Sequence, residues 1–163
     1  MNRWLPLVLL GATLPASPAA SHGPPQALSV TPEARPGFRA LWAASVAAKA
    51  ERVACLASLE DGDTLRIVRV LPLTVGADST AVSAAASLEQ CGPPAWQGTV
   101  HTHIPLADGR RPNPLFSGAD RGVMLMWWQR WKMDGTFCLL YAENQAHCEI
   151  DGSQLVILPS ARY

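Results

Sequence analysis

The chain has 163 residues, with 13 basic and 13 acidic side chains, so its formal net charge at pH 7 is zero. This length fits one domain. A composition of 48% apolar and 16% charged residues provides for a hydrophobic core and excludes a disordered chain. Because there is no basic surplus, nucleic acid is not expected as a partner.

The first 21 residues have the layout of a secretory signal peptide. Arg3 supplies a positive start, residues 5–14 are an apolar run, and small residues follow over 16–21. The run is too short to span a bilayer, and no cysteine follows it to carry a lipid anchor. We therefore expect residues 1–21 to be removed, no stable membrane association afterwards, and a periplasmic or secreted protein. An uncleaved anchor or a misassigned start codon is the alternative.

Export affects the interpretation of the cysteines, which number four: Cys55, Cys91, Cys138 and Cys148. An even number in an oxidising compartment suggests disulfides, and four cysteines permit three pairings. Cys138 and Cys148 lie symmetrically about an expected hairpin, so we favour that pair and, with it, Cys55–Cys91. The alternative is four buried thiols acting as small apolar side chains. A cysteine-based zinc site is disfavoured, because no two cysteines have C-x-x-C spacing.

In chain order, residues 22–32 are rich in Pro and Ser and are expected to form a flexible lead-in. Apolar side chains at helical spacing predict a helix over 33–50. A strand is expected over 51–59, followed by the hairpin signal Asp61-Gly62 and a second strand over 65–71.

The Ala-, Ser- and Pro-rich stretch 73–95 is expected to hold a strand and a short helix over about 79–89. A strand over 98–104 leads into a loop over 106–114, and a helix follows over 117–133. The remaining expected strands are 136–142, 146–150 and 155–158. This order predicts one α/β domain with a mixed sheet over residues 33–160.

Candidate metal ligands lie at the junction between the expected strand 98–104 and the helix after it. His101 and His103 are two apart on a strand, so both imidazoles leave from the same face. Asp120 lies in the first turn of the helix, which packing can bring back towards them. Two histidines and one carboxylate leave a fourth tetrahedral position for water, the arrangement of a catalytic zinc site.

Two further residues are candidates for catalysis. Glu51 is expected to act as the general base for the zinc-bound water, and Ser117 as a hydrogen-bond donor to the oxyanion. Each motif also has an ordinary structural interpretation. An isolated H-x-H is more often a surface or structural feature. Ser117 and Asp120 form a helix-capping pattern, and Glu51 suits a salt bridge.

Other conspicuous side chains are given structural roles. The tryptophans at 127, 128 and 131 are expected in the core and on an amphipathic, partly exposed surface that permits a dimer or partner. His147 is expected to be exposed or near the end of a hairpin.

Together, Glu51, His101-Thr102-His103 and Ser117-Gly118-Ala119-Asp120 resemble the motif of the JAMM metalloprotease family, in its prokaryotic JAB-domain form. That motif has an upstream Glu, then H-x-H, a spacer and S-x-x-D. Residues 51–56 look like the family's Glu strand, and the helix after Asp120 also has a counterpart. The resemblance covers about residues 34–158.

The resemblance implies a cytidine-deaminase-like fold, with a curved mixed sheet flanked by helices. It also implies that His101, His103 and Asp120 hold Zn²⁺, that Glu51 shuttles the proton, and that Ser117 steadies the tetrahedral intermediate. Family members hydrolyse amide bonds, including isopeptide bonds in ubiquitin-like conjugates. Others have lost the metal ligands and act as scaffolds.

Two departures from the family pattern affect the loop after the histidines. Ile104 stands where the family usually has Pro, and the 13 residues between His103 and Ser117 exceed the usual spacer. A surface loop tolerates such an insertion, because closure entropy grows slowly with length. One hypothesis is that Arg110 or Arg111 contacts an acidic substrate, and a solvated loop is the alternative.

We therefore expect a zinc-dependent metallopeptidase or amidohydrolase that cleaves a peptide or isopeptide-like amide in a peptide or protein substrate outside the cytoplasm. The alternative is a non-catalytic MPN-like binding or scaffold module that docks a protein partner. Deaminase chemistry is disfavoured, because no cysteine pair follows the histidine motif as zinc deaminases require.

Overall fold

The computed structural model describes residues 23–74, 84–104 and 112–163, and residues 84–86 by their backbone alone. The expected signal peptide and the arginines at 110 and 111 lie outside these residues. The elements in chain order are β1 (Ala27–Val30), α1 (Arg35–Ala48), β2 (Val53–Asp61), β3 (Thr64–Pro72), α2 (Ala84–Gln90), β4 (Gly98–Thr102), α3 (Gly118–Trp131), β5 (Gly135–Ala142), β6 (Gln145–Asp151), β7 (Val156–Ile157) and β8 (Ala161–Arg162).

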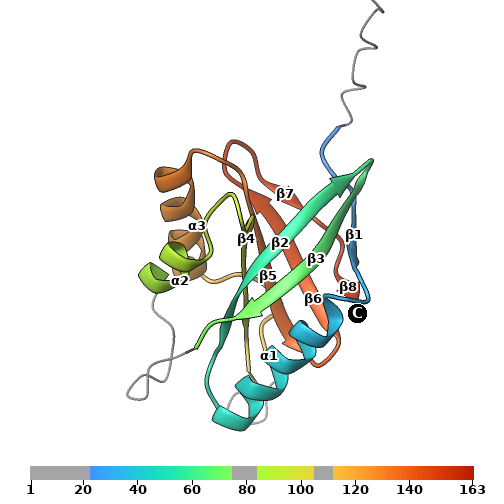
Figure 1. Cartoon of the computed structure of the whole chain (residues 1–163), viewed down its shortest axis with the longest axis vertical. Coiled ribbons are helices and arrows are strands. Elements are labelled where there is room, and N and C mark those ends of the chain that lie inside the picture. Colours follow the sequence, from blue (N-terminus) through green and yellow to red (C-terminus); the bar gives the residue numbers. More distant parts are fainter. Residues whose placement is uncertain (1–22, 75–83, 105–111) are drawn as a thin grey trace, which may run out of the picture.

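The strands form one curled mixed sheet in the order β1-β3-β2-β4-β5-β6-β7, with β8 also paired to β6 (Figure 1). The β2–β3 and β5–β6 pairs are antiparallel hairpins, and the β1–β3 and β4–β5 pairs are parallel. The β2–β3 turn holds Gly62 at φ +63°, a left-handed conformation that glycine adopts without strain. The expected α/β domain with a curved mixed sheet flanked by helices is confirmed.

Two hydrophobic clusters cover the opposite faces of the sheet, because successive strand residues alternate sides. On β2, Leu56 packs in the cluster of α1, together with Phe38 and Leu41. Its neighbour Cys55 belongs to the other cluster, with Met124 and Trp127 of α3 and other buried residues. Helix α1 therefore covers one face, while α2 and α3 cover the other (Figure 1).

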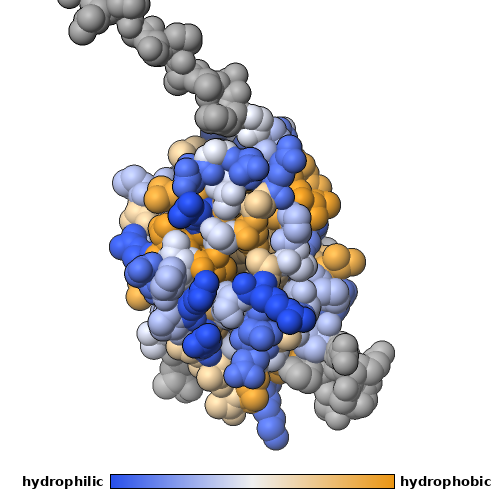
Figure 2. All heavy atoms as spheres, turned by 90° about the vertical axis from the view of Figure 1, so that its right-hand side faces the viewer, coloured by the Kyte–Doolittle hydropathy of each residue, from blue (hydrophilic) through white to orange (hydrophobic). Residues whose placement is uncertain are grey.

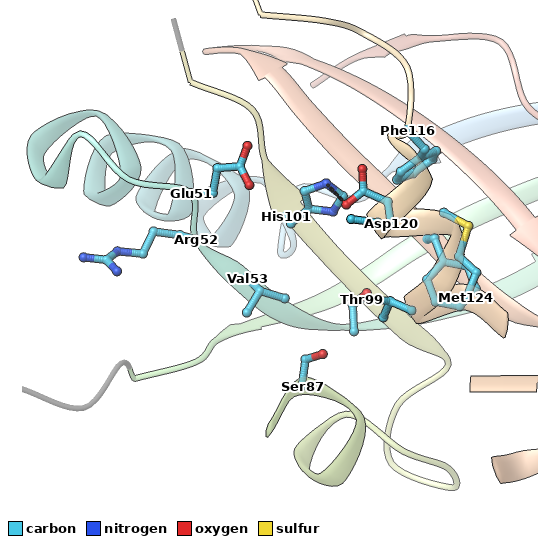
Figure 3. A pocket seen from close by; sticks show the side chains of 12 residues that line it. Glu51, Arg52, Val53, Ser87, Thr99, His101, Phe116, Asp120 and Met124 are labelled. Atoms are coloured by element: carbon cyan, nitrogen blue, oxygen red, sulfur yellow. Dashed lines mark ion pairs between the residues drawn. The ribbon is translucent and has the colours of Figure 1, made fainter. Parts of the chain in front are cut away.

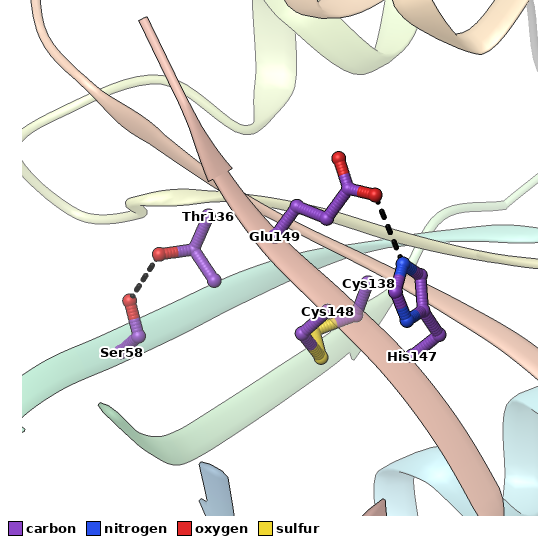
Figure 4. The surroundings of a disulfide bond; sticks show 6 residues. All are labelled: Ser58, Thr136, Cys138, His147, Cys148 and Glu149. Atoms are coloured by element: carbon purple, nitrogen blue, oxygen red, sulfur yellow. Dashed lines mark hydrogen bonds and ion pairs between the residues drawn. A yellow bond between two sulfur atoms is a disulfide. The ribbon is translucent and has the colours of Figure 1, made fainter. Parts of the chain in front are cut away.

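Both favoured disulfides are present. Cys138 and Cys148 are direct cross-strand partners of β5 and β6, and their bond lies inside the sheet (Figure 4). The bond between Cys55 and Cys91 ties β2 to the end of α2. Disulfides of this kind are typical of oxidising, extracytoplasmic compartments. Among the described residues, no helix combines the length and apolar character needed to cross a membrane.

The domain boundaries expected from the sequence are too narrow at both ends. The expectation that residues 22–32 form a flexible lead-in is wrong, because β1 pairs with β3 and Val30 is buried in the core. At the other end, β8 lies beyond residue 160 and pairs with β6. Both strands are short and lie at the sheet margin, so they have too few residues to show an alternating pattern.

Three other expectations can be compared with the structure. Trp127 is 1% exposed, so it lies in the core, one of the two places expected for the tryptophans, and not on an exposed surface. His147 is buried rather than exposed, and it lies near the start of β6, at the end of the β5–β6 hairpin, which was the other position expected for it. The strand expected within 73–95 is not found in 73–74 or 84–95, while residues 75–83 lie outside the described residues; α2 is the short helix expected there.

On the face of the molecule shown in Figure 2, hydrophilic and hydrophobic residues are interspersed.

Gly98 gives a test of the β4–β5 pairing. A Cβ at this position would lie 1.7 Å from the carbonyl oxygen of Thr136, so the two backbones would have to separate. We expect Gly98→Ala to destabilise the fold by about 1–3 kcal/mol, the range found for overpacked sites. In Gly122→Ala, the control on α3, nothing lies within 4 Å of the new Cβ. Thermal unfolding followed by circular dichroism compares the two, and an unchanged Tm for Gly98→Ala would contradict this pairing.

Candidate metal centre

Strand β4 places the two histidines on one face, as the H-x-H spacing predicts. His101 lies within the strand, opposite Val53 of β2 and Leu139 of β5. The His103 N–H continues the ladder by donating to the Leu140 carbonyl at 2.8 Å. Thr102 between them is fully buried on the α1 side, where its hydroxyl shares a 2.6 Å hydrogen bond with Ser45.

Thr102 also anchors the segment that carries Glu51. The Arg52 N–H donates to the Thr102 hydroxyl at 2.9 Å, and the Thr102 N–H donates to the Arg52 carbonyl at 3.0 Å. These bonds hold the chain just before β2 beside the end of β4. The Glu51 side chain is 57% exposed, and its Oε1 lies 4.0 Å from His103 Nε2. Glu51 thus borders the histidines from the solvent side.

The first turn of α3 brings Asp120 to the histidines. Ser117 is the N-cap: its hydroxyl accepts from the Asp120 N–H at 3.3 Å, while the Asp120 carboxylate accepts from the Ser117 N–H at 2.6 Å. This capping box satisfies two backbone donors that the helix itself leaves unpaired. The capping interpretation of the Ser-x-x-Asp pattern is therefore confirmed, and the same turn carries Asp120 to β4.

The Nε2 atoms of the two histidines and the carboxylate of Asp120 converge at this point. His101 Nε2 lies 3.4 Å from His103 Nε2 and 3.2 Å from Asp120 Oδ1, while Asp120 Oδ2 lies 3.7 Å from His103 Nε2. In a tetrahedral zinc site with bonds of ~2.0–2.1 Å, neighbouring donor atoms are ~3.4 Å apart. The spacing of the side chains therefore fits one tetrahedral metal ion, and Figure 3 shows Asp120 facing His101.

Hydrogen bonds orient these groups and set their protonation. His103 Nδ1 lies 2.8 Å from the Asn113 carbonyl oxygen, which only accepts, so Nδ1 carries a proton and the neutral ring would present a lone pair at Nε2. A hydrogen bond with Asp120 raises the pKa of His103, so a proton and a metal ion compete for that nitrogen. Burial raises the pKa of Asp120, but hydrogen bonds with both histidines outweigh it and hold that pKa well below its ordinary range. Asp120 is thus ionised.

A pocket of about 240 Å³ opens beside this group (Figure 3). Glu51, His101 and Asp120 line it together with residues of β2, β4, β5, α2 and α3. Ser117 is exposed at the N-cap and is not among the lining residues. Of the five residues singled out from the sequence, four therefore meet around one spot, while the Ser117 side chain is placed by its role as a cap.

Sequence reasoning missed a second polar network behind the site. The Arg121 guanidinium donates to both carboxylate oxygens of Glu149, and the Nη2–Oε1 bond is 2.9 Å long. His147 Nε2 shares a 2.9 Å hydrogen bond with Glu149, and Figure 4 shows the two side chains facing one another along β6. Phe116 lies against both His101 and His147, at ring-centroid distances of 5.7 and 5.6 Å. The available signal was His147-x-Glu149, the same two-residue spacing as the H-x-H.

This network fixes α3 to the sheet. Arg121 directly follows Asp120, and Glu149 lies on the central part of β6 with a side chain that is 2% exposed. A buried carboxylate is tolerated only when it is paired and hydrogen-bonded, as Glu149 is. The ion pair therefore holds the first turn of α3, and Asp120 with it, at a set position over the sheet.

Comparison with known proteins finds a distant structural similarity. No protein-family model matches the chain, and no curated protein matches it either. Among solved structures, the chain is similar to the solution structure of protein DSY2949 from Desulfitobacterium hafniense, with 16% sequence identity and a TM-score of 0.48. The match covers 81% of this chain and 92% of that one. The JAMM resemblance therefore remains a proposal that rests on the residues and their geometry.

The metal ligands are open to direct test. We expect the purified protein to bind about one zinc per chain and to lose it in His101→Ala and Asp120→Asn. Asn keeps an oxygen that can accept the Ser117 N–H, so helix α3 retains its start. Ser117→Ala is the control: it loses about 1 kcal/mol of stability with its cap but keeps the metal. Elemental analysis after dialysis measures the zinc content of each variant. Full zinc binding by Asp120→Asn would contradict the assignment of Asp120 as a ligand.

The network of Arg121, Glu149 and His147 predicts a specific acid sensitivity. Burial raises the pKa of Glu149, but hydrogen bonds with Arg121 and His147 outweigh it and lower that pKa. The stability that Glu149 contributes is therefore present above the ordinary Glu pKa of ~4.3 and is lost as pH falls through the lower folded-state value. Glu149→Gln should unfold more easily at pH 7, by about 1–3 kcal/mol, and lose less stability on acidification.

Urea titrations at pH 7 and at several acidic values measure this difference. Glu60→Gln, at an exposed position of β2, serves as the control and should follow the wild type at each pH. If the wild type and Glu149→Gln lose stability in parallel across the acid range, Glu149 is not the source of the acid sensitivity.

Proposed function

We propose that this chain is a zinc-dependent metallopeptidase or amidohydrolase of JAMM type, which cleaves a peptide or isopeptide-like amide outside the cytoplasm. The observation that carries the proposal is the convergence of His101 Nε2, His103 Nε2 and an Asp120 oxygen at tetrahedral spacing, with Glu51 on the solvent side. Two disulfides in the same domain agree with an extracytoplasmic site of action.

The donor set supports zinc with an open coordination position. Two imidazoles and one carboxylate are typical of catalytic zinc, whereas structural zinc sites are closed by four protein ligands. Non-haem Fe(II) sites use the same set, so elemental analysis is needed to identify the metal. Bound by these three residues, zinc supplies a Lewis acid and a water whose pKa is lowered to about 7.

Glu51 is the residue proposed to move the proton. Its carboxylate is half exposed, faces His103 at 4.0 Å and lines the same pocket as His101 and Asp120. From there it is placed to accept a proton from the attacking water and to pass it to the leaving amine. The bonds between Arg52 and Thr102 hold the adjacent backbone and limit how far Glu51 moves.

Ser117 is proposed to assist at the oxyanion. Its oxygen already accepts from the Asp120 N–H, which orients the hydroxyl while leaving its own proton available for donation. A donor directed at the developing negative charge lowers the barrier for acyl transfer.

The decisive variant is Glu51→Gln. The amide retains the size of the side chain but cannot take up the proton, so we expect unchanged zinc content and kcat/KM reduced about 10²–10⁴-fold. Glu60 is another exposed glutamate, on β2, and Glu60→Gln should match the wild type. Two quantities are measured for each variant: its zinc content, and its turnover of peptide and isopeptide libraries, which is followed by mass spectrometry. A zinc-loaded wild type that cleaves no amide in either library would favour the alternative, a binding module.

A further inference from the structure

The pocket beside the metal ligands is built mainly from apolar side chains. Val123 and Met124 of α3 form one wall, Val53 of β2 another, and Phe137 of β5 lies on the sheet beneath them. Phe116 and Ala119 also line the pocket, and the Phe116 ring lies against His101. The pocket therefore begins at His101 and Asp120 and extends between α2 and α3 over the sheet (Figure 3).

Polar groups in the pocket are unevenly distributed. Glu51, His101 and Asp120 belong to the candidate metal centre. Arg52 also lines the pocket, next to Glu51, with its side chain extending away from His101 and Asp120 (Figure 3). Beyond them, Thr99 and Ser87 contribute only hydroxyls from β4 and α2. Among the described lining residues, a charged head group carried past Arg52 and the metal centre, between Thr99, Ser87 and the apolar walls, would find no opposite charge. Burial of an unpaired charge is strongly unfavourable. The chemistry of the lining therefore selects an uncharged group.

The size of the pocket limits what it holds. Sites for whole drug-sized ligands are ~300–1,000 Å³, whereas this pocket is about 240 Å³. It suits one side chain rather than a whole ligand. Met124 and Phe137 are each only 2% exposed and pack in the same buried cluster as Trp127, so the pocket has firm walls.

From these features we propose that the pocket is a specificity site for one uncharged, apolar side chain next to the scissile amide, of about the size of Leu or Phe. This inference rests on the proposed function, because it assigns the substrate class of the same site. Val123 determines the depth of the site: it lies one helical turn after Asp120 and half-buried on the pocket wall. Substrates with small or charged residues at that position are turned over more slowly.

Binding of alkyl hydroxamic acids tests the proposal without any need for turnover. The hydroxamate group chelates the metal, and its tail probes the pocket. For the zinc-loaded wild type we expect the Kd measured by calorimetry to fall from acetohydroxamic to hexanohydroxamic acid. Each methylene that fits should contribute a factor of a few up to tenfold. 6-Aminohexanohydroxamic acid, which ends in a cation, should show little of this gain.

Two substitutions of Val123 should shift the preference in opposite directions. Val123→Ala deepens the pocket and moves the best tail towards octanohydroxamic acid, while Val123→Phe fills it and moves the best tail towards butanohydroxamic acid. Loss of folding alone would not produce opposite shifts. Met126→Phe is the matched control, because Met126 lies on α3 but is 43% exposed and is not a lining residue.

The outcomes separate the two proposals. A chain that takes up no metal overturns the proposed function and, with it, the specificity site. A chain that binds zinc and acetohydroxamic acid, but gains no affinity with longer tails, overturns the specificity site alone. Tighter binding of the amino-terminated tail than of its alkyl counterpart also overturns it, because the pocket would then select a cation.

Discussion

The carboxylate of Asp120 serves two structures at once. Its Oδ2 accepts the backbone N–H of Ser117 and closes the capping box of α3, while its Oδ1 lies 3.2 Å from His101 Nε2. The helix therefore begins where the carboxylate meets the histidines, so the start of α3 and the position of the Asp120 carboxylate are coupled. Arg121 adds a second restraint one residue later through Glu149 of β6. A ligand fixed by both a cap and a buried ion pair is preorganised, so a metal would bind there with little reorganisation.

Thr102 has a comparable role on the other side of the site. Strand alternation directs the histidines on either side of it to the metal face and Thr102 itself to the α1 face, where Ser45 and the Arg52 backbone share its hydroxyl. The packing of α1 is thereby connected to the position of Glu51, although that helix lies across the sheet from the candidate centre. Loss of this hydroxyl would loosen Glu51 while leaving both histidines on their strand.

Local chemistry explains how much of this was predictable from the sequence. Strand alternation predicted the shared face of the histidines, the Ser-x-x-Asp spacing predicted the cap, and the hairpin symmetry predicted the Cys138–Cys148 bond. What escaped prediction depends on contacts distant in sequence. β1 is a strand because β3 presents it with an open edge, and His147 is buried because Glu149 and Phe116 surround it. The pocket joins residues from five elements, which no local pattern brings together.

The long spacer after His103 contributes to the candidate site. Asn113, near its far end, provides the carbonyl oxygen that orients the His103 ring, and the Asn113 side chain accepts the Leu115 N–H at 3.0 Å. Leu115 leads directly to Phe116, whose ring lies against His101. The end of the spacer therefore has contacts with both histidines before α3 begins. An orienting partner of this kind strongly influences metal affinity, so the end of this spacer bears directly on the candidate metal centre.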